Sequence, residues 1–239
     1  MQLKREVWDT SQTKVFNEYL QSLKNESRID FTKKIYATNK ECLAIKIPTL
    51  REIGKQIAKG NAQSFIDNLQ HNFVEDDILV ALLIEHLQNF DLQKKYIKKL
   101  LNCADSWVCT DTLKIKNVNF NDMLCFCNEL YKSSHNYLRR YSFVALLPFA
   151  KYEECVLRIF DLVLNASTEQ DYYVCMAISW LLCEIMINFP NKTIEFLINY
   201  KMLYKNKNNE FIIKKTIYKC QDSFRIDKKL KIKLKELLF

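Results

Sequence analysis

The stretch Ser106-Trp107-Val108-Cys109-Thr110-Asp111 lies near the middle of the 239-residue chain, inside a segment with helical periodicity. Trp107 and Asp111 are four residues apart, so on an α-helix they occupy the same face. A buried carboxylate needs hydrogen-bonding partners, and a buried indole N–H usually has one as well. This pair is therefore the first candidate for a functional site, and the remaining chain determines what the pair faces.

The intervals along the chain from Trp107 to two other side chains indicate how the helices are arranged. Arg140 follows Trp107, and Trp180 follows Arg140, after intervals close to the length of one helical-hairpin repeat such as a HEAT or armadillo repeat. A globin-like fold or a helix bundle is also compatible with paired helices, but the spacing favours a solenoid. Stacked repeats would place all three residues on one concave surface.

Helical periodicity extends through almost the whole chain, and no segment shows a convincing strand alternation. We therefore predict an all-α fold, a right-handed superhelical solenoid of about thirteen helices that forms a single domain over residues 1–239. Pro48 suits a first helical turn, Gly60 a helix end, and Asn119 and Asn121 are candidate caps. The candidate helical segments cover residues 10–23, 26–37, 48–59, 61–70, 75–90, 91–101, 104–114, 119–132, 135–151, 152–165, 168–188, 190–200, 207–221 and 225–238.

The composition excludes several classes of protein. With 2 Gly and 3 Pro, the chain lacks the turn residues of all-β and βαβ folds. Gly54 and Gly60 cannot build a GxGxxG or Walker loop, so we expect no nucleotide cofactor. The longest apolar stretch, Met176 to Ile187, is interrupted by Glu184 and is too short to span a membrane.

The nine cysteines are scattered and odd in number, and no apolar leader precedes them in MQLKREVWDT. Reduced thiols in the cytoplasm are the natural interpretation. Cys125 and Cys127 form only a C-x-C pair, and the three histidines do not extend it to a zinc pattern. We therefore expect neither a metal nor a cofactor.

The formal net charge of +8 makes a polyanionic partner plausible. Ordinary lysines on solvated helix faces would account for part of this charge, because 29 of the 36 basic residues are lysines. In so lysine-rich a chain, the adjacent Arg139 and Arg140 stand out as a choice of guanidinium over ammonium.

Four segments together resemble the AlkD-like DNA alkylation repair proteins, the HEAT-like-repeat DNA glycosylases. Their order and spacing match that family over about residues 30–226, and part of the tail near Arg225 is similar as well. The segments are Ala44-Ile45-Lys46-Ile47-Pro48-Thr49-Leu50-Arg51, Ser106-Trp107-x-x-x-Asp111, Tyr137-Leu138-Arg139-Arg140-Tyr141-Ser142 and Ala177-Ile178-Ser179-Trp180-Leu181-Leu182-Cys183-Glu184.

The resemblance implies hydrolysis of the N-glycosidic bond of cationic purines alkylated at N3 or N7, in duplex DNA bound on a concave basic face. Asp111 would stabilise the oxocarbenium-like sugar and position the attacking water. Trp107 and Trp180 would pack against the deoxyribose. Arg140 would hold a nearby phosphate, with Arg139 as a candidate helper.

The chain departs from the family pattern at three positions. Ala44 stands where the family usually has Gly, and Cys183 replaces an arginine on the presumed DNA side. Lys46 occupies a position where a neutral polar residue can contact DNA, so we include it among the DNA-binding candidates. We expect a cytoplasmic monomer, associated with the nucleoid when bound to DNA. The alternative is a non-catalytic HEAT-like scaffold that binds DNA or protein without excising a base.

Overall fold

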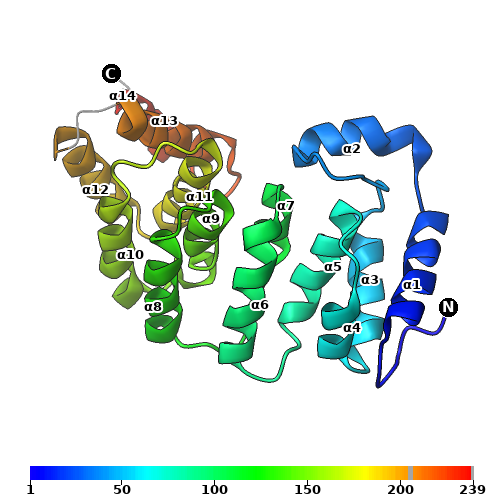
Figure 1. The fold of residues 1–239 in the computed structure, drawn as a ribbon. Helices are drawn as coiled ribbons and strands as arrows, with labels where there is room; N and C mark the ends of the chain where they lie inside the picture. Colours follow the sequence, from blue (N-terminus) through cyan, green and yellow to red (C-terminus); the bar gives the residue numbers. More distant parts are fainter. Residues whose placement is uncertain (204–206, 238–239) are drawn as a thin grey trace. The chain divides into compact units, whose positions relative to one another are not determined.

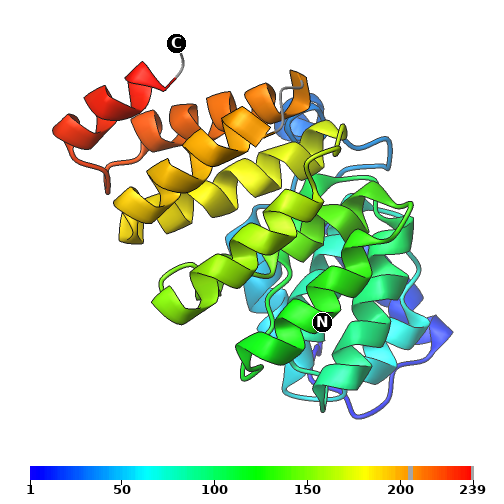
Figure 2. The same cartoon turned by 90° about the vertical axis from the view of Figure 1, so that its left-hand side faces the viewer.

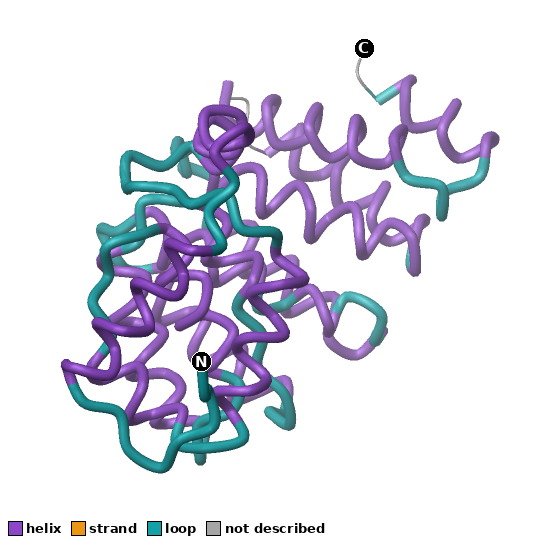
Figure 3. Tube along the Cα trace, turned by 90° about the vertical axis from the view of Figure 1, so that its right-hand side faces the viewer, coloured by secondary structure: helices purple, strands orange, loops and turns teal. Residues whose placement is uncertain are grey.

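A computed structural model of the chain describes residues 1–203 and 207–237. In this part of the chain the fold is all-α, with fourteen α-helices and two short 3-10 helices (Figure 3). The described residues contain no regular strand, and a lone parallel bridge joins Glu41 to Phe73. The predicted fold class is therefore confirmed, and the fourteen α-helices in the described residues agree with the prediction of about thirteen.

The chain folds as two compact units, Met1–Val118 and Asn119–Phe239. The organisation of residues 1–239 as a single domain stays a prediction. Within each unit the helices pack against their neighbours in sequence, as expected for helical repeats.

In the first unit α3, α5 and α7 form one row, because α5 packs against both of the others (Figure 1). Helix α4 packs against α1, α3 and α5, and α6 packs against α5. The bounds are α1 Thr10–Ser22, η1 Glu26–Arg28, α2 Ile29–Tyr36, α3 Ile47–Ala58, α4 Ala62–Asn68, α5 Val74–Ile84, α6 Phe90–Cys103 and α7 Trp107–Thr112.

In the second unit α9, α11 and α13 form the corresponding row, and α12 packs against α11 and α13 (Figure 2). Helix α8 packs against α9 and α10. The bounds are α8 Phe120–Tyr131, α9 Asn136–Val144, η2 Leu147–Phe149, α10 Glu153–Asn165, α11 Tyr172–Asn188, α12 Pro190–Leu203, α13 Lys207–Asp222 and α14 Lys228–Glu236.

Within each unit, every second helix thus packs against the next member of its row, which is the pattern of stacked helical hairpins. Trp107 lies on α7, Arg140 on α9 and Trp180 on α11. These three residues therefore lie on every second helix of the chain, as the repeat interpretation requires.

Polar caps set many helix boundaries. Asp9, Asn61 and Asn89 accept hydrogen bonds from backbone N–H groups in the first turns of α1, α4 and α6. Asn119 caps α8 as predicted. Asn121, the other candidate, instead accepts a hydrogen bond from Arg158. Each such cap contributes about 1 kcal/mol, because it satisfies an N–H that has no partner within the helix.

Two predicted helices are too long. The segment 104–114 shrinks to α7, because Ala104 is extended and Ser106 accepts the N–H of Val108 as the cap. The segment 75–90 ends at Ile84, because Asn89 takes the extended conformation that caps the next helix. In both cases the apolar pattern of the sequence continues across the helix boundary. The boundary is set instead by a capping side chain, Ser106 or Asn89.

Other boundaries move for similar reasons. The segment 26–37 is a 3-10 turn followed by α2, and 135–151 is α9 followed by a second 3-10 turn. Asp171 and Asp227 cap α11 and α14, so these helices begin later than predicted. Residue 238, the predicted end of the last helix, lies outside the described residues.

Gly60 follows the end of α3 as predicted, but for a different reason. Its φ is not positive, so the left-handed freedom of glycine is not used. A Cβ at this position would lie 2.1 Å from the carbonyl oxygen of Arg5. Glycine is needed here because the N-terminal segment passes directly over the turn, where Asn61 N–H donates to the same oxygen.

All nine cysteines lie in the described part of the chain and are free thiols. Burial raises the pKa of Cys42 to about 11 and that of Cys175 to about 12, so both are protonated at neutral pH. Among the described helices, none combines the length and the apolar character needed to cross a lipid bilayer.

Candidate functional site

The predicted site residues are divided between the two units. Trp107, Asp111 and Lys46 belong to the first unit, and Arg139, Arg140 and Trp180 to the second. All of them lie in or directly before helices of the α3–α5–α7 row or the α9–α11–α13 row.

The Trp107 ring is held in place by the end of α2. Its Nε1–H donates to the carbonyl oxygen of Ile35 at 3.0 Å, and the ring meets Tyr36 edge to face at 6.3 Å between centroids. The hydroxyl of Ser106 donates to the carbonyl of Tyr36 at 2.6 Å. The side chain of Trp107 is partly exposed, so an oriented indole remains accessible to a ligand.

Asp111 lies one turn further along α7 and is also partly exposed. The hydroxyl of Thr110 is 3.0 Å from Asp111 Oδ1 and 2.7 Å from the carbonyl oxygen of Trp107. A hydrogen bond from Thr110 would restrict the rotamer of the carboxylate. The pair thus presents an oriented indole and an oriented carboxylate, and neither side chain is part of the buried core.

Asp105, just before α7, connects this helix to the loop after α2. Its Oδ1 accepts the hydroxyl of Thr38 at 2.6 Å, and its Oδ2 accepts the N–H groups of Asn39 and Lys40 at 2.7 and 3.2 Å. Because these contacts join segments that are far apart in the sequence, they fix where α7 begins relative to the loop.

The same loop is held from its other side by Glu75 in the first turn of α5. The Glu75 carboxylate is fully buried and accepts the backbone N–H groups of Leu43, at 3.1 Å, and Ile45, at 3.3 Å. The Cys42 thiol lies 3.6 Å from Oε1. Hydrogen bonds from neutral donors to a buried charge are strong, so Glu75 anchors the 42–45 segment.

Asp77 forms a second buried anchor for this loop. Its Oδ2 pairs with the ammonium of Lys40, and its Oδ1 lies 2.7 Å from His71 Nδ1. Asp77 is almost completely buried, whereas Lys40 is partly exposed. Glu75, Asp77 and Asp105 were not among the predicted site residues. The consecutive acids Glu75, Asp76 and Asp77, at the start of an apolar helix, could have indicated a buried acidic cluster.

Asp76, between the two acidic anchors of α5, caps this helix. Its Oδ2 accepts the N–H groups of Asn72 and Phe73 at 2.9 and 2.8 Å, while Oδ1 has no hydrogen-bond partner among the described residues. Burial raises the pKa of Asp76 to about 7, against the lowering effect of these two N–H donors. The folded protein therefore favours a protonated Asp76 well above the ordinary pKa of 3.8.

The contribution of Asp76 to the free energy of unfolding should consequently fall with rising pH. A raised folded-state pKa means that the native state binds more protons than the unfolded state between about pH 4 and pH 7, so the free energy of unfolding decreases over this interval. The expected loss is on the order of 3 kcal/mol. Urea unfolding at pH 5 and pH 8, compared between wild type and Asp76→Asn, isolates this contribution; equal pH slopes for the two proteins would contradict it.

The turn before α3 keeps the shape expected of the family's glycine. Ala44 has a φ of 56°, in the left-handed region, although a methyl group there costs about 1–2 kcal/mol. The anchors from Glu75 on either side, at Leu43 and Ile45, hold this conformation. Lys46 follows as the N-terminal flanking residue of α3, with an exposed side chain, so it is accessible for the predicted DNA contact.

In the second unit, Arg139 is engaged by its own protein. Its Nε donates to Glu169 at 2.8 Å, and its Nη1 donates to the carbonyls of Ser133 and Ser134 at 3.2 and 2.8 Å. Glu169 is itself buried. These bonds close the turn before α9, so the structure gives Arg139 a structural role, and its role as a helper in phosphate binding stays a prediction.

Arg140 is 5% exposed and packs against α11, where its Nη1 donates to the carbonyl oxygen of Tyr173. Its position ties α9 to α11, and its role in holding a phosphate stays a prediction.

Trp180 is partly exposed on α11, and its Nε1–H lies 3.4 Å from Oε1 of Glu184. The same oxygen accepts a hydrogen bond from Arg225. Cys183, which stands in place of the family's arginine, is instead buried beside Cys220. Arg225 therefore supplies a guanidinium close to Trp180, although the sequence pattern lacks one there.

The stacked helical hairpins within each unit make this an all-α helical-repeat protein. Alternate helices carry the two indoles, the carboxylate and the guanidinium groups of the candidate site. The chain belongs to the DNA alkylation repair enzyme family, whose sequence profile matches residues 16–218. No curated protein and no solved structure matches the chain. Membership gives the protein a role in DNA repair, and the residues in the matched range include every predicted site residue.

Proposed function

We propose that the protein is a monofunctional DNA glycosylase that releases cationic purines alkylated at N3 or N7 from duplex DNA. The observation that carries the proposal is the Trp107–Asp111 pair, one turn apart on α7, both partly exposed and both oriented by hydrogen bonds. Family membership supports a DNA repair role in general.

The chemistry suits these side chains. Alkylation places a positive charge on the base, so the base departs as a neutral molecule and needs no strong general acid. The sugar left behind develops positive charge, which a carboxylate stabilises by Coulomb attraction and an indole face by its quadrupole. Asp111 would also accept a proton from the water that attacks the sugar.

The roles of the second-unit residues follow the resemblance. We assign Trp180 to contact with the deoxyribose, its ring supported by Glu184 and Arg225. Arg140 is assigned to a phosphate next to the lesion, as the resemblance implies. Lys46 adds an exposed cation in the first unit.

One observation favours a second candidate, a scaffold that binds DNA without excising a base. The guanidinium groups of Arg139 and Arg140 are largely used within the protein, the first by Glu169 and two carbonyls, the second in a buried position. A protein with this fold could retain these contacts for stability alone.

The deciding experiment is a base-release assay. Purified protein is incubated with methylated duplex DNA in the presence of a chelator, and released 7-methylguanine and 3-methyladenine are quantified. We expect release at a rate well above that of the DNA alone. Binding to the DNA without release at any protein concentration would replace the glycosylase proposal by the scaffold.

A further inference from the structure

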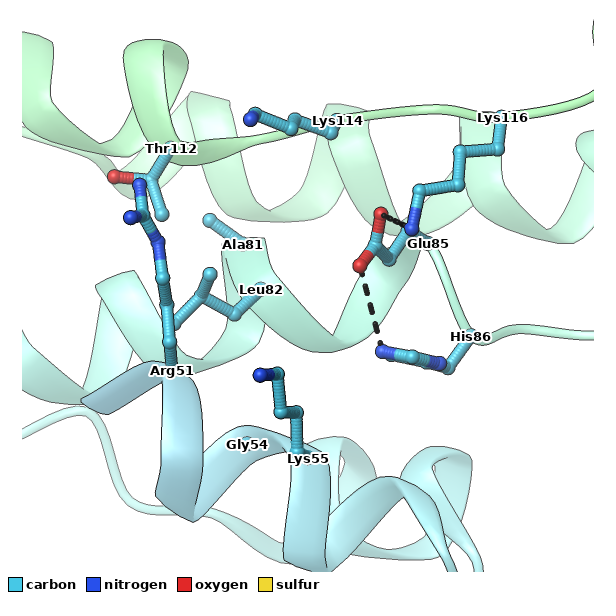
Figure 4. A pocket seen from close by; sticks show the side chains of 10 residues that line it. All are labelled: Arg51, Gly54, Lys55, Ala81, Leu82, Glu85, His86, Thr112, Lys114 and Lys116. Carbon is cyan, nitrogen blue, oxygen red and sulfur yellow. Dashed lines mark ion pairs between the residues drawn. The ribbon is translucent and has the colours of Figure 1, made fainter. Parts of the chain in front are cut away.

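A pocket of about 290 Å³ opens in the first unit between α3, the end of α5 and the segment that follows α7 (Figure 4). Its base is formed by small or apolar residues, among them Gly54 and Ala81. Basic side chains approach it from both sides: Arg51 and Lys55 from α3, Lys114 and Lys116 from the segment after α7 (Figure 4). None of the catalytic assignments above involves these residues.

Three of these cations have no partner in the part of the chain that the structure describes. Within residues 1–203 and 207–237, Arg51, Lys55 and Lys114 form no hydrogen bond or ion pair with another side chain or with the backbone. Arg51 and Lys55 are separated by one helical turn, so they extend from the same face of α3. Like charges brought together in this way repel one another unless an anion lies between them.

The pocket contains one carboxylate, Glu85, and that carboxylate is already neutralised. Its Oε2 lies 3.0 Å from the ammonium of Lys116, and its Oε1 lies 3.5 Å from His86 Nε2 (Figure 4). Glu85 is therefore unable to compensate Arg51, Lys55 and Lys114 as well. The pocket keeps a surplus of positive charge that no described residue balances.

We propose that this pocket binds a phosphate group, held by Arg51, Lys55 and Lys114. A guanidinium donates two parallel N–H groups to phosphate oxygens, and each ammonium adds a point charge. The buried hydroxyl of Thr112, next to the Arg51 side chain in Figure 4, offers a neutral donor. The pocket volume is ample for a phosphate with its ester substituents.

The phosphate would come either from the backbone of DNA or from a small phosphate ester. Thr112 directly follows Asp111 in α7, so a backbone phosphate in the pocket would bring DNA to the helix that carries the candidate carboxylate. This assignment to DNA rests on the proposed function, whereas phosphate binding itself does not.

The test uses Arg51→Gln/Lys55→Gln, which removes two of the unpaired charges, and a matched control, Lys4→Gln/Lys14→Gln. Both control lysines are exposed in the first unit, outside the pocket. Affinity for unmodified duplex DNA is measured against salt concentration, and affinities for inorganic phosphate and for a nucleoside 5′-monophosphate by calorimetry. Lys114→Gln provides a second pocket variant, and circular dichroism verifies folding.

If the phosphate belongs to DNA, the pocket variants bind DNA about tenfold more weakly, and the slope of log K against log salt becomes shallower by about 1. If it belongs to a small ester, phosphate or the nucleotide binds wild type and the control pair but not the pocket variants. Unchanged DNA affinity together with no phosphate or nucleotide binding to wild type would overturn the proposal. DNA binding that depends on the pocket without base release would sustain the pocket and contradict the glycosylase.

Discussion

Asp111→Asn is expected to slow the release of alkylated purines by a factor of about 10² to 10³, the loss typical of removing one preorganised charge from a developing ion. Asparagine retains the shape and the hydrogen-bond acceptor for Thr110, at the contact of 3.0 Å. What disappears is the negative charge that would stabilise the sugar cation. Single-turnover base release from methylated duplex DNA measures the effect directly.

The matched control is Asp91→Asn on α6, which removes the same charge from an exposed carboxylate whose ion-pair partner is Lys94. We expect this variant to release base at the wild-type rate. Because Asp111 is partly exposed, the Asn variant should also unfold at nearly the wild-type temperature. Equal rates for wild type and Asp111→Asn would exclude the carboxylate from the chemistry.

Glu75→Ala should lower the free energy of unfolding by about 3 kcal/mol, because it leaves buried backbone donors without an acceptor. The N–H groups of Leu43 and Ile45 both depend on this carboxylate, at 3.1 and 3.3 Å. Between them lies Ala44 with its strained φ of 56°. Urea unfolding at pH 7 gives the change in the free energy of unfolding.

Glu18→Ala serves as the control, since Glu18 is an exposed residue of α1 with no ion pair within the described part of the chain. It should change stability by less than about 0.5 kcal/mol. Glu75→Gln keeps one acceptor oxygen but turns an NH₂ group toward backbone donors, so an intermediate loss is expected. A Glu75→Ala protein as stable as wild type would show that the 42–45 segment is held by other contacts.

Much of the fold follows from local properties of the sequence. The 3.6-residue periodicity is present in nearly every segment, and the scarcity of Gly and Pro leaves few places where another structure could form. The alternation of Trp107, Arg140 and Trp180 on every second helix was predictable from spacing alone. Boundaries were less predictable, because Ser106 and Asn89 interrupt apolar patterns through caps rather than through a change in hydrophobicity.

The candidate site was predictable only in part. The Trp107–Asp111 face depends on a separation of four residues, which a helix converts into proximity. In contrast, Asp105 reaches a loop much earlier in the chain, and Arg225 reaches Glu184 from beyond the end of α13. Contacts of this kind depend on which helices pack together, and no local pattern records them.

The amino-acid sequence by itself determined the helical class, the repeat spacing and the indole–carboxylate pair, because each depends on residue type and short-range geometry. Only the tertiary structure decided that Arg139 pairs with Glu169, whereas Arg51, Lys55 and Lys114 have no partner among the described residues. In sequence these cations look alike. What separates them is whether an acid from a distant segment lies within about 4 Å, since ion pairs form only at such short range.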